Sequence, residues 1–121
     1  MDITPYLLDN PRFLAMDIRG VYEDSAPDYI EPILREGIAD GSIHTEYPRE
    51  LAEVMMILSD VWLHPSLQPT TPEEMRTRCI LYNQLTRPFG FEVLDDDLIE
   101  AMVRYTRELQ DQQKGRVKDD S

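Results

Sequence analysis

The sequence predicts an all-α fold, a bundle of about five helices in a single domain. Apolar residues recur at helical spacing, and prolines and glycines divide the chain into segments of helical length. No alternation of apolar and polar residues lasts long enough to predict a strand. We expect one helical domain over residues 1–109 and a polar, disordered tail over residues 110–121.

Two helices are expected in the first third of the chain. Asn10 followed by Pro11 is a typical helix start, and this predicts a helix to about residue 23. The segment 25–40 has apolar positions spaced i, i+3, i+4, i+7 and i+8, and Gly41 is a suitable end. Gly37 lies within that apolar stripe, where we expect it to let another helix approach closely.

The helix that begins at Pro48 and runs to about residue 64 is apolar on most of its circumference. Its polar residues fall on one narrow stripe: Arg49, Glu53, Asp60 and His64. A surface helix buries an apolar face of a hundred degrees or somewhat more, and this helix exceeds that. We therefore expect it to be buried on two sides, against its own domain and against a partner subunit.

Two further helices follow. Thr71 and Pro72, with acidic residues after them, begin a helix that breaks at residues 88–90. Asp97 with Glu100 three residues later resembles a capping box and predicts the start of the last helix, which runs to about Leu109.

The composition excludes several classes of function. The formal net charge is −12, which repels phosphate backbones and acidic membranes, so we expect no direct nucleic-acid binding by this chain. The longest apolar run, residues 54–58, is far too short to span a bilayer. No signal peptide is visible and Cys79 is the only cysteine, which favours a cytoplasmic protein.

Residues 33–52 carry a resemblance to a known family. They read ILREGIADG, then Ile43, then PRELA from Pro48. This stretch resembles the C-terminal regulatory domain of TetR-family transcriptional regulators. The resemblance implies a homodimer in which helices 48–64 and 72–87 pair with their copies as a four-helix bundle, and a pocket for a small apolar or amphipathic effector.

The chain departs from that family at its N-terminus. The family places a helix-turn-helix DNA reader before this domain, and nothing before Asn10 resembles one. A shortened chain, a fragment and a natural reader-less relative all remain possible readings. We expect an effector-sensing and dimerisation domain, and as an alternative a reader-less module that heterodimerises with a related regulator.

Two sets of candidate site residues follow from these expectations. The candidate dimer interface comprises Leu51, Val54, Leu58, Val61, Trp62, Met75, Cys79 and Tyr82. The candidate effector pocket is lined by adaptable or hydrogen-bonding side chains: Phe13, Met16, Tyr22, Tyr29, Met55, Met56, Ser59 and Trp62. For any single pocket residue, a place in the core is the alternative interpretation.

Metal and catalytic sites are not expected, and neither is a cofactor. The run Asp95–Asp97 with Glu100 has carboxylates that could share a hard cation, but helix capping explains it better. His44 and His64 lack converging partners for catalysis or zinc. Cys79 lies on an apolar helical stripe and is expected to be a core residue. We expect no enzyme.

Overall fold

The computed structural model describes residues 9–119, and side chains as far as residue 115. Residues 1–8 and 120–121 of the expected domain and tail lie outside the described residues. The elements in chain order are α2 (Pro11–Gly20), the π-helical segment η1 (Val21–Ile30), α3 (Glu31–Asp40), α4 (Pro48–Ile57), the π-helical segment η2 (Leu58–Trp62), α5 (Pro72–Thr86), the 3-10 turn η3 (Arg87–Phe89) and α6 (Asp96–Asp119). All regular secondary structure in the described residues is helical and none of it is strand, which confirms the all-α prediction.

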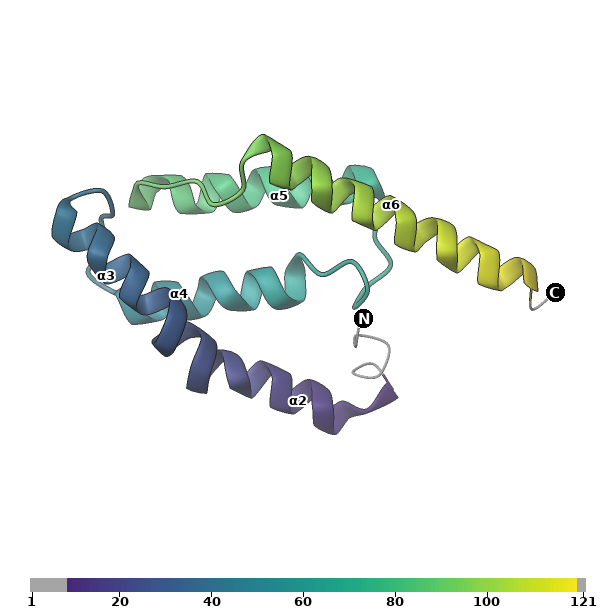
Figure 1. Cartoon of the computed structure of the whole chain (residues 1–121), viewed down its shortest axis with the longest axis horizontal. Coiled ribbons are helices and arrows are strands. Elements are labelled where there is room, and N and C mark those ends of the chain that lie inside the picture. Colours follow the sequence, from purple (N-terminus) through teal and green to yellow (C-terminus); the bar gives the residue numbers. More distant parts are fainter. Residues whose placement is uncertain (1–8, 120–121) are drawn as a thin grey trace.

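The described residues form four continuous helical rods: α2–η1–α3, α4–η2, α5–η3 and α6. The number is smaller than expected because the first two expected helices form one rod. Figure 1 shows α2 passing through η1 into α3 as one bent helix. Pro27 lies inside η1, where in an α-helix its ring would crowd the carbonyl four residues earlier. In η1 the main-chain hydrogen bonds span five residues instead of four, as in the bond from Glu31 N–H to Ala26 O. This wider turn accommodates the proline without ending the helix.

The helix ends were predicted well at three sites and wrongly at one. Asn10 Oδ1 accepts from Arg12 N, and Thr71 Oγ1 accepts from Glu74 N. Gly41 ends α3 at a φ of 87°. The expected cap at Asp97 is wrong, because α6 begins at Asp96 and Asp95 Oδ1 accepts from Leu98 N at 2.8 Å.

The last helix is longer than expected. It continues to Asp119, so residues 110–119 of the expected disordered tail are helical in this structure. This stretch is polar but rich in glutamine, lysine and arginine, which have high helix propensity and can extend an existing helix without burying a face.

The core is divided into two clusters. The first lies where α5 meets α6 and receives Leu63 from the end of the α4–η2 rod. Its buried members are Leu63, Met75, Cys79, Tyr82, Leu94, Ile99 and Val103. The second lies where α4 packs against η1 and α3, and its buried members are Ala26, Leu34, Ala52 and Met55. In Figure 1, α4 lies between the α2–η1–α3 rod and the α5–α6 pair.

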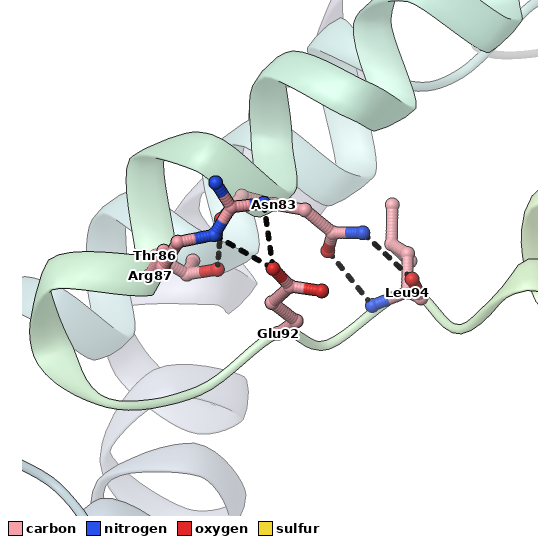
Figure 2. A network of polar contacts seen from close by, with 5 residues as sticks. All are labelled: Asn83, Thr86, Arg87, Glu92 and Leu94. Atoms are coloured by element: carbon pink, nitrogen blue, oxygen red, sulfur yellow. Dashed lines mark hydrogen bonds and ion pairs between the residues drawn. The ribbon is translucent and has the colours of Figure 1, made fainter.

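A polar clasp fixes the loop between α5 and α6. The buried amide of Asn83 donates from Nδ2 to Leu94 O at 2.7 Å and accepts at Oδ1 from Leu94 N at 3.1 Å. Figure 2 shows this pair beside the ion pair of Arg87 with Glu92, in which Nη2 lies 2.7 Å from Oε1. Because both main-chain groups of Leu94 bond to one side chain, the loop is held to α5 at a single residue.

Two glycines allow the α3–α4 linker to lie close to its neighbours. A Cβ on Gly37 would lie 2.4 Å from Ile43 Cδ1, so the close approach expected at Gly37 is made by this linker residue and not by another helix. A Cβ on Gly90 would lie 2.3 Å from Ser42 O, and Gly90 has a φ of 104°. Gly90 is therefore required both by its backbone conformation and by the contact with the linker.

Candidate functional site

An apolar groove separates α4 from α5. It encloses a volume of about 320 Å³ and is lined by Thr45, Tyr47, Glu50, Leu51, Val54, Met55, Leu58, Tyr82, Leu85, Thr86 and Phe89. Eight of these eleven side chains are aliphatic or aromatic. The volume is at the small end of the range for ligand sites in proteins.

Hydrogen bonds link the chain segments next to each end of the groove. At one end, Ser59 Oγ and the Tyr82 hydroxyl lie 3.2 Å apart, and Ser59 Oγ donates to Met55 O at 2.8 Å. At the other end, His44 N donates to Phe89 O at 2.8 Å. Between these contacts α4 and α5 are apart, so the groove has fixed ends and an open length.

The Tyr82 phenol is a buried structural group. Burial raises the pKa of the Tyr82 hydroxyl above its usual value, and the hydrogen bond with Ser59 offsets part of that rise. The neutral phenol therefore persists at all ordinary pH values and serves as a hydrogen-bonding anchor between the rods.

Beyond the Tyr82 end of the groove, Arg78 makes a second contact between α5 and the α4–η2 rod. The Arg78 guanidinium donates from Nη1 to Trp62 O at 3.2 Å and to Thr70 Oγ1 at 3.3 Å. A cation at the last carbonyl of the η2 segment satisfies a group that the helix itself leaves unpaired. The α4–η2 rod is thus fixed to α5 at its C-terminal end.

Most polar side chains that line the groove already form hydrogen bonds within the chain. Thr45 Oγ1 accepts from Tyr47 N, and Thr86 Oγ1 donates to Asn83 O. The Glu50 carboxylate, by contrast, makes no hydrogen bond or ion pair within the part of the chain that the structure describes. Glu50 is also the only charged residue of the groove lining, so the groove carries one uncompensated negative charge at its linker end.

The structure brings together only part of the expected dimer interface. Leu51, Val54 and Leu58 line the groove, Val61 is exposed and Trp62 is half-buried against the α5–α6 cluster. The other three members, Met75, Cys79 and Tyr82, are buried in the core between α5 and α6, and of these three Tyr82 also lines the groove. The correction has a simple cause: α6 already covers that stripe of α5.

The exposed apolar stripe of α5 is formed by other residues. Leu81 and Leu85 lie four residues apart and are 42% and 47% exposed, and Leu85 lines the groove. The sequence contained this signal, because α5 has apolar residues on two stripes. The expected interface uses the stripe that α6 covers, because residue spacing alone does not show which of the two stripes faces a partner.

Most of the expected effector-pocket residues do not face the groove. Met55 lines it, whereas Met56, Ser59 and Trp62 are half-buried and do not belong to its lining. The aromatic and methionine residues of the first rod are exposed: Phe13, Met16, Tyr22 and Tyr29. The structure therefore does not gather the eight residues around one cavity.

The acidic and thiol groups have structural surroundings. In the described residues, no group of three or more histidine, cysteine or acidic side chains is placed to hold a metal ion. Glu100 instead forms a two-pronged ion pair with Arg76 of α5, which lowers the pKa of that carboxyl. Burial raises the pKa of the Cys79 thiol, which disfavours its reactive thiolate form.

Comparison with known proteins adds no relative to these observations. No family model, no curated protein and no solved structure matches this chain. Among the helices of the described residues, none has the length and hydropathy needed to cross a membrane.

Proposed function

We propose that the chain acts as the effector-sensing and dimerisation domain of a TetR-like transcriptional regulator. The observation that carries the proposal is the unpartnered apolar face along α4 and α5. Val54 on one wall of the groove is 55% exposed, and Leu85 on the other is 47% exposed. These are the two helices that the resemblance assigns to the subunit interface.

A second copy packed on this face would bury both rims. Val61 lies seven residues after Val54 and Leu81 four before Leu85, so each helix offers an apolar stripe along its length. Burying one such side chain contributes roughly 1.5–3 kcal/mol, and two copies double the number of side chains. That gain is large enough to offset the freedom lost on association.

Sensing would operate through a population shift. A ligand held between α4 and α5 changes the separation of the two helices that meet the partner, and so favours one angle between subunits. In an intact regulator that angle sets the spacing of the DNA readers. The chain by itself is proposed not to bind DNA, consistent with its net charge of −12.

Light scattering across a dilution series tests the dimer. We expect twice the chain mass for the wild type, and the chain mass for Val54→Glu and Leu85→Glu, because a carboxylate at either rim opposes burial. Leu98→Glu is the matched control, since Leu98 is 42% exposed on α6 and does not line the groove. A wild type that stays monomeric at high concentration overturns the proposal.

The charge of the chain favours a second candidate, a module that heterodimerises with a related regulator. Two copies that each carry −12 repel one another, whereas a less acidic relative would not. Subunit exchange with a labelled related domain distinguishes the two candidates. Preference for the relative that disappears at high salt supports heterodimerisation, and equal preference supports the homodimer.

A further inference from the structure

The length and volume of the groove indicate the shape of a ligand that would fit it. It follows α4 from Tyr47 to Leu58, which at about 1.5 Å per residue is a length of roughly 16 Å. The groove has a volume of about 320 Å³ along this length. A helix of the same length is about 10–12 Å across with its side chains and has a much larger volume, so the groove suits one extended hydrocarbon chain better than a helix.

The residues that line the groove indicate the polarity of the middle part of the ligand. Between Leu51 and Leu58 on one wall, and between Tyr82 and Phe89 on the other, the polar hydroxyls are bonded within the chain. This part offers no free partner to a polar ligand atom, so a polar occupant would lose its hydration without compensation. The middle of the ligand must therefore be apolar.

The end of the groove next to the α3–α4 linker indicates the charge of the ligand. The unpaired Glu50 carboxylate and the exposed ring of Tyr47 lie together at this end, in the first turn of α4 and just before it. A carboxylate and an aromatic face both attract an ammonium group. The net charge of −12 adds to this preference, because it concentrates cations near the surface and repels anions.

We propose that the groove binds a linear cationic amphiphile, with its hydrocarbon chain between α4 and α5 and its ammonium group beside Glu50 and Tyr47. The ligand lies parallel to α4, with the end of the hydrocarbon chain near the Ser59–Tyr82 contact. This inference names the ligand class for the sensing role and rests on that proposed function. Of the expected pocket residues, only Met55 lines this groove.

Titration calorimetry with alkyltrimethylammonium salts, below their micelle-forming concentrations, tests the inference. We expect Kd to fall about four-fold for each added methylene from hexyl to decyl, because each is buried in the groove. The fall should stop once the roughly 16 Å length is filled. Decyl sulfate should bind about ten-fold more weakly than decyltrimethylammonium, since it meets Glu50 with the opposite sign.

Two variants with the same change in net charge separate a specific site from general attraction. Glu50→Gln should weaken binding of the decyl cation about two- to five-fold, as expected for an exposed ion pair. Glu53→Gln, on the same helix but outside the groove lining, should leave binding unchanged. Val54→Trp fills the groove at an exposed rim and should reduce affinity ten-fold or more, with the circular dichroism spectrum unaltered.

Three outcomes overturn the inference. They are equal affinity for the cationic and sulfate amphiphiles, equal effects of Glu50→Gln and Glu53→Gln, and an affinity that does not depend on chain length. Light scattering of the same samples keeps the proposed function separate. A monomer that binds the decyl cation retains this site and refutes the dimer, and a dimer that does not bind it retains the dimer and refutes this site.

Discussion

The α5–α6 pair buries Met75, Cys79 and Tyr82 almost completely, whereas α2 buries none of its residues. The two parts of the chain have similar helical patterns but different packing. Around α5 the buried residues are large, and the buried polar groups Asn83, Thr86 and Thr106 are all hydrogen-bonded. Such a core resists local unfolding and holds its helices in fixed positions.

The α2–η1–α4 part is built differently. Two of its four buried residues are Ala26 and Ala52, which let η1 approach α4 closely but contribute little apolar area. Large side chains such as Phe13 and Met16 stay in solvent. The α5–α6 part therefore buries most of the large side chains, both parts present exposed apolar residues, and the groove lies at the boundary between them.

The largest expected difference between the two parts comes from truncating one methionine in each. Met75 is fully buried, so Met75→Ala should lower the free energy of unfolding by about 2–5 kcal/mol. Met16 is 62% exposed, so Met16→Ala should change it by less than about 0.5 kcal/mol. Urea denaturation of both variants measures the contrast, and equal losses would refute the assignment of the stable core to α5–α6.

A glycine pair tests the junction between the two parts. Gly90→Ala should cost about 2–4 kcal/mol, from the positive φ and from the collision with Ser42 O of the linker. Gly20 lies inside the first rod with open space at its Cβ position, so Gly20→Ala should stabilise the protein by about 0.5–1 kcal/mol. Thermal melting should therefore shift in opposite directions, and a shift in the same direction would contradict the contact.

The polar clasp of the α5–α6 loop is expected to have a smaller effect. Asn83→Ala leaves the N–H and C=O of Leu94 without their partners, at a cost of about 1–3 kcal/mol. Thr77→Ala on the exposed face of the same helix removes only a local bond to Glu73 O and should be nearly neutral. Hydrogen exchange at the Leu94 amide gives a direct readout, since only Asn83→Ala should accelerate it.

The smallest expected effect is a dependence of stability on pH, from Asp60 of η2 and Asp17 of α2. Burial, and then the charge of Asp17, raise the pKa of the Asp60 carboxyl, while His64 lowers it. Above its ordinary value of 3.8, the folded state therefore keeps a proton that the unfolded state has lost, and stability falls as pH rises through that range.

Replacing Asp60 removes this loss. Asp60→Asn should raise the free energy of unfolding at pH 7 by less than about 1 kcal/mol, and should give no gain near pH 3. The exposed residue Asp111 provides the control, since Asp111→Asn should be neutral at both pH values. A gain for Asp60→Asn that is larger at pH 3 than at pH 7 would contradict the direction of the pKa shift.

Local chemistry predicted the helix starts more reliably than it predicted continuity. Asn10, Thr71 and Gly41 act within a few residues of themselves, so the sequence signal was sufficient for each. Two separate helices are expected over residues 11–23 and 25–40, but the structure joins them, because a π-helical segment carries Pro27 and Pro32 lies in the first turn of α3. The acidic run was ambiguous because any of three neighbouring aspartates can cap a helix, and Asp95 does so.

The sequence by itself determined the all-α class and the apolar character of the helix that begins at Pro48. Only the tertiary structure decided which stripe of α5 is free, because α6 covers Met75 and Cys79 and leaves Leu85 exposed. It also decided that Glu50 lies unpaired at one end of an apolar groove. Helical periodicity is a property of neighbouring residues, whereas the choice of which apolar face is covered depends on how distant helices pack.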